Sequence, residues 1–142
     1  MPIILDTNLV SELMYVSPDP NVIDWFDAQD PSNLLLTTIT EAELLYRIEL
    51  MPEGKNRRGL LALTDSMLTD TFGSRILVFD SEAAIRYAVL AASRRSQGRP
   101  IDLPDCFIAA IASSIGAAVA TRNVRDFVGC GIEVINPWEH SP

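Results

Sequence analysis

Five short apolar segments, separated by stretches with helical periodicity, constrain the fold most strongly. They are predicted as buried strands and cover residues 3–5, 34–38, 76–79, 117–121 and 132–135. Most are apolar throughout, which is typical of parallel strands covered on both faces. Strands that alternate with helices indicate an α/β domain. We therefore expect a single α/β domain over residues 1–142, with a central parallel sheet of about five strands flanked by helices.

The intervening segments carry recognisable helix signals. Thr7 and Asn8 are cap-type residues that begin a short helix after the first strand. Thr40 and Glu43 fit the capping-box pattern T-x-x-E at the start of another helix. A long helix is predicted over residues 81–96, and its apolar positions share one face of the kind that packs on a core: Ala84, Ile85, Ala88, Val89 and Ala92.

Length and composition fit one globular domain. The chain has 142 residues, of which 48% are apolar and 21% charged, and this excludes an intrinsically disordered chain. The N-terminus has no basic region followed by a long apolar run, so we expect no signal peptide. No apolar run approaches the ~20 residues of a membrane span. We expect no membrane association and a cytoplasmic protein.

Cysteine and histidine are too sparse for several kinds of site. Cys106 and Cys130 form no C-x-x-C pair and lack zinc-type spacing. His140 is the sole histidine and lies in the C-terminal tail. These residues argue against a zinc site and against Ser-His-Asp or Cys-His catalysis, and the two cysteines fit a reducing compartment.

The net charge of −8 is distributed unevenly. Residues 1–53 contain ten acids and one base, residues 54–125 contain ten bases and six acids, and the remaining residues contain three acids and no base. The overall sign argues against a protein that holds nucleic acid by charge alone. The positive middle segment can nevertheless meet a phosphate backbone.

Four acids are expected at one edge of the sheet. Asp6 ends the first strand, and Glu43 follows the second. Asp105 begins the helix before the fourth strand, and Asp126 lies one turn beyond that strand, after Thr121 and Asn123. Ligands of open α/β sheets bind outside the carboxyl ends of the strands. A helix that precedes a parallel strand begins at this same edge, so all four carboxylates are predicted to meet there.

Each acid also has a purely structural interpretation. Asp6 can cap a helix, Glu43 can complete a capping box, Asp105 can oppose a helix dipole, and Asp126 can be a surface acid. Taken together, converging carboxylates raise one another's pKa values or recruit a cation. Oxygen ligands favour Mg²⁺ or Mn²⁺. Such an ion acidifies water and binds a phosphodiester in line with it.

Other phosphate-binding folds lack support. The chain has neither G-x-G-x-x-G nor a P-loop, which argues against dinucleotide and nucleoside-triphosphate binding. A phosphoacceptor receiver domain has a similar acidic edge but needs a lysine after a late strand. Lys55 is the only lysine and is not placed there.

Four motifs, in order and spacing, resemble the PIN domain over nearly the whole chain: ILDTN at 4–8, TEAEL at 40–44, LPDCFIAA at 103–110 and ATRNVRDF at 120–127. The closing NPW at 136–138 resembles VapC and FitB-like toxins of type II toxin–antitoxin pairs. The resemblance implies a single PIN domain and an Mg²⁺- or Mn²⁺-dependent endoribonuclease that leaves 5′-phosphate and 3′-hydroxyl ends.

The resemblance also implies roles for the acids. Asp6 and Asp105 are expected to hold a metal ion directly. Glu43 and Asp126 are expected to bind through water, to orient the attacking water, or to complete a second metal site. Family members place the fourth carboxylate at the position of Asn123 or that of Asp126, and we favour Asp126.

Supporting residues are expected around these acids. Thr121 is expected to hydrogen-bond an acid or a metal-bound water, Asn8 to orient Asp6, and Asn123 to lie nearby. RNA contact is expected from arginines: Arg94, Arg95, Arg99, Arg122 and Arg125.

The resemblance further implies a cognate antitoxin, an RNA substrate, and a homodimer or a toxin–antitoxin hetero-oligomer. Apolar residues of the early helices are candidates for these interfaces: Leu9, Val10, Leu13, Met14 and Leu45. Two alternatives stay open. One is a non-catalytic PIN-like module for protein binding or regulation. The other is a DNA nuclease, although such chains usually carry extra arches for which 142 residues leave little room.

Overall fold

The core of the molecule is a five-stranded parallel sheet. The computed structural model describes residues 1–141. The strands are β1 (Ile3–Leu5), β2 (Leu34–Thr37), β3 (Ile76–Leu77), β4 (Ala118–Ala120) and β5 (Val134–Ile135). Their order is β3-β2-β1-β4-β5, and every neighbouring pair is parallel. The predicted α/β fold is therefore confirmed, and β1 is the central strand.

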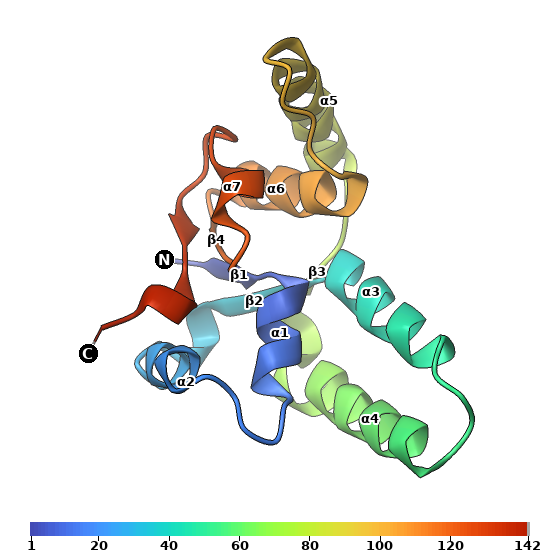
Figure 1. Ribbon diagram of the computed structural model, residues 1–142. Helices are drawn as coiled ribbons and strands as arrows, with labels where there is room; N and C mark the ends of the chain where they lie inside the picture. Colours follow the sequence, from blue (N-terminus) through green and yellow to red (C-terminus); the bar gives the residue numbers. More distant parts are fainter. Residues whose placement is uncertain (142) are drawn as a thin grey trace.

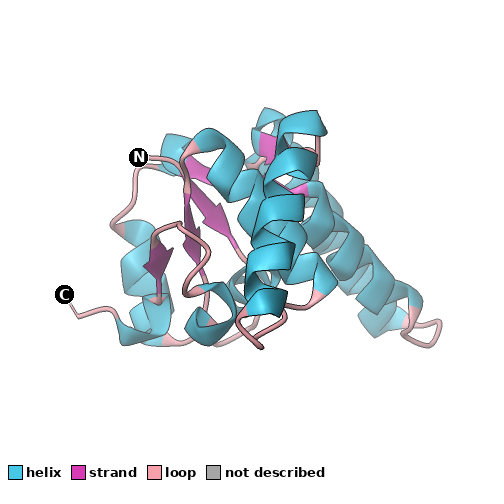
Figure 2. Ribbon diagram, turned by 90° about the horizontal axis from the view of Figure 1, so that it is seen from above, coloured by secondary structure: helices cyan, strands magenta, loops and turns pink. Residues whose placement is uncertain are grey.

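Helices connect the strands and cover both faces of the sheet (Figures 1 and 2). Within residues 1–141 they are α1 (Thr7–Leu13), α2 (Pro20–Asp27), α3 (Thr38–Glu49), α4 (Lys55–Ser66), α5 (Ser81–Ser96), α6 (Leu103–Ile115) and α7 (Val124–Phe127). A π-helical turn, η2 (Met67–Thr71), continues α4. Short 3-10 turns are η1 (Pro31–Asn33), η3 (Gly73–Arg75) and η4 (Pro137–Glu139). None of the described helices is long and apolar enough to cross a membrane.

Successive residues of β1 enter two separate hydrophobic cores. Ile3 and Leu5 pack in the core that includes Val22 of α2. Ile4 points to the opposite face and packs in the core that includes Ile108 of α6. This alternation follows from the two-residue period of a strand, and each fully buried side chain of this size contributes about 1.5–3 kcal/mol. The apolar composition of the strand is thus explained by burial on both faces.

Four of the five strands are shorter than predicted, and β1 has its predicted bounds. The second strand ends at Thr37, whose hydroxyl oxygen accepts from the backbone N–H of Thr40 at 3.2 Å. This bond makes Thr37 the N-cap of α3. The prediction that Thr40 and Glu43 form a capping box was wrong, since Thr40 lies inside the helix. Both threonines are fully buried.

The predicted apolar face of the long helix is exposed, which corrects the sequence interpretation. Ile85 is 59% exposed and Val89 65% exposed. The other face of α5 packs on α6, where the rings of Tyr87 and Phe107 have centroids 5.1 Å apart. Figure 1 shows α6 between α5 and the sheet. Because α5 packs on a helix and not on the sheet, it buries only a narrow stripe of its surface, which contains Ala83.

Candidate active site

The buried carboxylate of Asp6 is the centre of the candidate site. Asp6 follows the central strand directly and is 2% exposed. Its Oδ1 accepts from the backbone N–H of Thr7 at 2.8 Å, which caps α1. Its Oδ2 accepts from the hydroxyl of Thr121 at 2.7 Å. The helix cap is therefore real, and it leaves the carboxylate at the carboxyl edge of the sheet.

Thr121 hydrogen-bonds an acid, one of the two partners predicted for it, and so joins the ends of two neighbouring strands. It follows β4, and its hydroxyl donates to Asp6. The same hydroxyl oxygen accepts from the backbone N–H of Asn123 at 2.9 Å. Asn8, in contrast, is exposed, and both donors to Asp6 come from other residues. The expected orienting role of Asn8 is thus filled by Thr7 and Thr121.

A threonine pair connects Glu43 to the same edge. The hydroxyl of Thr7 donates to Oε1 of Glu43 at 2.7 Å. It also lies 2.9 Å from the hydroxyl of Thr40. A hydroxyl has one proton, so Thr40 is the donor to Thr7 in this chain of bonds. Sequence reasoning had assigned both threonines to caps and missed this role. The signal available was a threonine directly after a strand-ending acid.

Asp105 lies in the first turn of α6, and its surroundings raise its pKa strongly. Its pKa is raised from 3.8 to about 7, first by partial burial and then by the charges of Asp6, Asp126 and Glu43, in that order of effect. Burial also raises the pKa of Asp6, with hydrogen bonds from Thr121 and Thr7 opposing the change. Perturbed carboxyl groups of this kind cluster at functional sites. The four predicted acids therefore share one electrostatic environment.

The acids form an electrostatic cluster and not a closed ligand cage. Among residues 1–141, no three Asp, Glu, Cys or His side chains converge closely enough to hold a metal ion as they stand. The donor set nevertheless consists of carboxylate oxygens, which suit Mg²⁺ or Mn²⁺. A partly buried carboxyl with a pKa of about 7 is also a group whose ionised form a cation would stabilise.

Asn123 and Asp126 are the two candidates for the fourth acid position, and of these Asp126 affects the other acids through its charge. Its charge raises the pKa of both Asp6 and Asp105. Asn123 is exposed and precedes α7 as its N-cap. Asp126, which is half-buried on α7, is therefore the candidate whose charge acts on the other acids.

The predicted arginine cluster is not a single surface, and Arg94 is a correction. Arg94 is 4% exposed, and its guanidinium donates to backbone carbonyls inside the protein. A buried guanidinium with these partners is not accessible to RNA. Arg95 and Arg99 are exposed at and beyond the end of α5.

Arg122 and Arg125 border a polar hollow beside the acids. Arg125 is exposed, and Arg122 lies over the ring of Trp138, with its guanidinium carbon 5.4 Å from the centroid. The hollow has a volume of about 460 Å³ and is lined by Arg122, Asn123, Val124, Arg125, Asp126, Asn136 and Glu139. Asp126 therefore belongs to both the acid cluster and this hollow.

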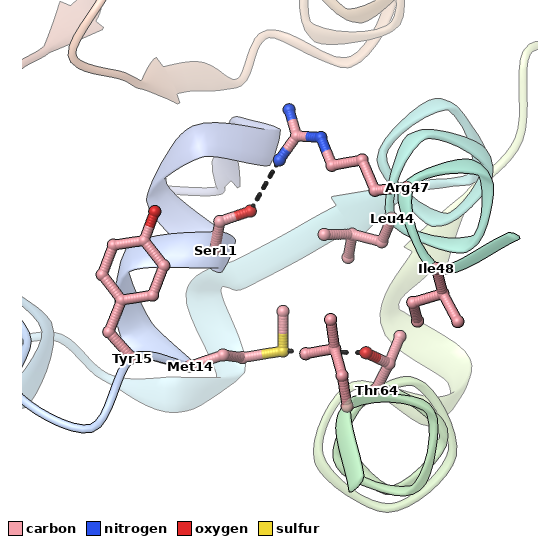
Figure 3. Close-up of a pocket in the computed structure, with 8 residues that line it drawn as sticks. Ser11, Met14, Tyr15, Leu44, Arg47, Ile48 and Thr64 are labelled. Atoms are coloured by element: carbon pink, nitrogen blue, oxygen red, sulfur yellow. Dashed lines mark hydrogen bonds between the residues drawn. The ribbon is translucent and has the colours of Figure 1, made fainter. Parts of the chain in front are cut away.

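A second, apolar pocket lies between α1, α3 and α4 (Figure 3). It has a volume of about 230 Å³ and no carboxylate lines it. Met14, Leu44 and Ile48 form much of its wall. Arg47 lies at its edge, where its guanidinium donates to the hydroxyl of Ser11 at 2.9 Å (Figure 3). Its composition suits docking of apolar side chains and not hydrolysis.

Comparison with known proteins gives consistent matches. The sequence profile of the PIN domain matches residues 3–128. The plasmid stability protein StbB of Pseudomonas syringae pv. tomato is 44% identical, over 96% of this chain and 99% of its own. The VapC ribonuclease Y4jK of Sinorhizobium fredii is 40% identical, over 96% and 98%. The solved structure of FitAB bound to an IR36 DNA fragment contains a chain with a TM-score of 0.91 and 32% identity, covering 99% of this chain and 98% of that one.

The raised pKa of Asp105 predicts a specific pH dependence of stability. The pKa of Asp105 in the folded protein, about 7, exceeds the ordinary value of 3.8. As pH rises from about 4 to 7, the carboxyl therefore ionises more readily in the unfolded chain than in the folded protein, and the free energy of unfolding falls. In buffer containing a chelator, we expect Asp105→Asn to melt at a higher temperature than wild type at pH 8. At pH 5 the two should differ much less.

Asp65→Asn on exposed α4 is the matched control, because it removes one acid outside the cluster. It should leave the pH dependence of the melting temperature unchanged. An equal offset between Asp105→Asn and wild type at both pH values would contradict the assigned environment of Asp105.

Proposed function

The chain belongs to the PIN-domain family of VapC and FitB-like toxins, and from this premise we propose that it is a metal-dependent endoribonuclease. In this proposal it acts as the toxin of a type II toxin–antitoxin pair. The observation that carries the proposal is the environment shared by Asp6, Glu43, Asp105 and Asp126, in which burial and mutual charge raise the pKa of Asp105 to about 7. Similarity to a VapC ribonuclease over 96% of this chain supports the reaction class.

The residues present suit a divalent cation. Asp6 and Asp105 would hold it directly, and Glu43 and Asp126 would act through water or at a second ion. A bound Mg²⁺ or Mn²⁺ acidifies the attacking water and offsets the charge of the phosphodiester. Thr7 and Thr121 keep the two oxygens of Asp6 in fixed directions, because each receives one hydrogen bond.

Hydrolysis in this proposal is an in-line displacement. The oxygen of water forms a bond to phosphorus, the bond from phosphorus to the 3′ oxygen breaks, and that oxygen takes up a proton. The products carry a 5′-phosphate and a 3′-hydroxyl. Glu43, held by the hydroxyl of Thr7, is suited to orient the water and to receive its proton.

RNA contacts are proposed at the polar hollow lined by Arg122 and Arg125. Both arginines lie in the segment that carries Asp126, so phosphates bound there are next to the acids. Stacking on Trp138 restricts the guanidinium of Arg122, which lowers the entropy lost on binding. Arg95 and Arg99 remain proposed as further phosphate contacts. The net charge of −8 implies that binding is local and not driven by the overall field.

An antitoxin protein is the proposed partner. The similarity to FitAB and the toxin family support it. The apolar pocket of Figure 3 offers a site for apolar side chains, and the acid cluster offers a site for a basic segment. Leu9 and Val10 are 0% and 1% exposed, so these two interface candidates belong to the core, whereas Met14 and the exposed Tyr15 line the pocket. A homodimer stays a prediction.

Removing either direct ligand should abolish cleavage. We expect Asp6→Asn and Asp105→Asn to reduce RNA cleavage in Mg²⁺ at least about a hundredfold, while circular dichroism shows a folded protein. Asp65→Asn should cleave like wild type. Full activity in either folded ligand variant would sink the assignment, and Mg²⁺ binding without cleavage by wild type would favour a non-catalytic module.

Removing the hollow's arginines should weaken RNA binding in a salt-dependent way. In an inactive Asp6→Asn background, Arg122→Gln with Arg125→Gln should lower affinity for single-stranded RNA. The slope of log affinity against log salt should fall by about 0.7 for each RNA phosphate that the protein no longer neutralises. Arg58→Gln, at an exposed position on α4, should preserve the slope. An unchanged slope in the double variant would place the RNA elsewhere.

Truncating the exposed wall of the apolar pocket should weaken binding of the antitoxin. Tyr15 is 59% exposed, so Tyr15→Ala is expected to fold normally and keep ribonuclease activity. Loss of an aromatic anchor should weaken binding of the co-expressed antitoxin about tenfold, measured by calorimetry. Val78→Ala, at a similarly exposed apolar position after β3, is the control. Wild-type antitoxin affinity in Tyr15→Ala would exclude this pocket as the docking site.

A further inference from the structure

A buried arginine connects α5 to the segment that carries Asp126. The Nη1 of Arg94 donates to the carbonyl oxygens of Asp126 at 3.1 Å and Val128 at 3.0 Å. It also lies 3.5 Å from the sulfur of Cys130, and Nε donates to the carbonyl of Arg99 at 2.7 Å. One side chain therefore holds backbone groups 32 and 34 residues away in sequence.

The location of this charge has a physical reason. Helix α7 has four residues, Val124–Phe127, so most of its carbonyls have no partner within the helix. A cation at the carboxyl end of a helix is favourable, and the fork of a guanidinium reaches acceptors in different directions. Burial of a charge is costly unless the charge is hydrogen-bonded, and these carbonyls supply the hydrogen bonds that offset this cost.

The opposite end of α7 is held by the acid cluster itself. The N–H of Asn123 donates to the hydroxyl oxygen of Thr121, and that hydroxyl donates to Asp6. Phe127 of α7 is fully buried and packs in the same core as Ile4. The short helix is thus attached at both ends and along its buried face.

We propose that Arg94 is a positioning residue for the active site: through the backbone of α7 it sets where the Asp126 carboxylate lies relative to Asp6 and Asp105. The proposal rests on the proposed function in that Asp126 serves the metal site. Arg94 touches no acid side chain of the cluster among its hydrogen bonds. Asp126 is the one member of the acid cluster among its hydrogen-bond partners, and the bond is to the backbone carbonyl of that residue.

A double-mutant cycle separates positioning from general stability. Arg94→Lys keeps the charge but cannot span the same acceptors. We expect it to weaken Mn²⁺ binding, measured by calorimetry without RNA, about tenfold, as when groups that hold a metal ligand are removed. In an Asp126→Asn background the same change should have less than about a twofold further effect. In a Glu43→Gln background it should keep its full effect.

The proposal is overturned if Arg94→Lys has equal effects in the Asp126→Asn and Glu43→Gln backgrounds, since a purely structural residue would show that pattern. Arg94→Gln is the second variant, because a neutral side chain avoids a buried unpaired charge, and the same pattern is expected. Failure of both variants to fold would place Arg94 in overall stability and would also overturn the proposal.

Arg86→Lys is the matched control, since Arg86 is exposed on the same helix, and it should bind Mn²⁺ like wild type. The calorimetry also separates the two proposals. Coupling between Arg94 and Asp126 without RNA cleavage would leave the positioning role intact and contradict the ribonuclease. Cleavage that depends on Mg²⁺ without such coupling would do the reverse.

Discussion

The rest of the site depends on the hydrogen bonds to the buried carboxylate of Asp6, which follows the central strand directly. One oxygen accepts a hydrogen bond from the backbone N–H of Thr7, the first residue of α1, and the other from the hydroxyl of Thr121, which follows the neighbouring strand β4. Thr7 then reaches Glu43, and Thr121 reaches the segment of Asp126. Because β1 lies between β2 and β4, the carboxylate at its end lies close to groups that follow both neighbouring strands.

The same arrangement explains part of the net charge of −8, because several of the acids are gathered at one edge of the sheet. Several acids are concentrated where burial and mutual repulsion raise pKa values, which is unfavourable for folding unless a cation or proton is present. Selection for stability alone would favour fewer charges at this edge. The acidic excess is therefore compatible with RNA binding through local arginines, and it offers a basic partner segment an attractive surface.

Much of the fold and the positions of the acids were predictable, because they follow from patterns along the chain. Apolar segments separated by helices give the parallel sheet, and strand-ending residues such as Asp6 then meet at its carboxyl edge. The role of Glu43 was harder to predict, since the T-x-x-E spacing of Thr40 and Glu43 also fits a capping box, which the structure does not form. Only the position of Thr7 shows what Glu43 contacts.

Other features depend on packing that no local pattern reveals. Arg94 and Arg95 are adjacent and chemically identical, yet one is buried and the other exposed. The apolar face around Ile85 was misassigned because α5 packs on α6 and not on the sheet. Both errors concern which elements lie beside one another at long sequence separation.

In the proposed function, these acids direct water to a phosphodiester with the help of a divalent ion. The most direct measurement is the chemistry of the ends produced when purified protein cleaves a defined RNA with Mg²⁺ or with a chelator. We expect 5′-phosphate and 3′-hydroxyl ends, formed only with the ion. Cyclic 2′,3′-phosphate ends, or equal cleavage in the chelator, would contradict it.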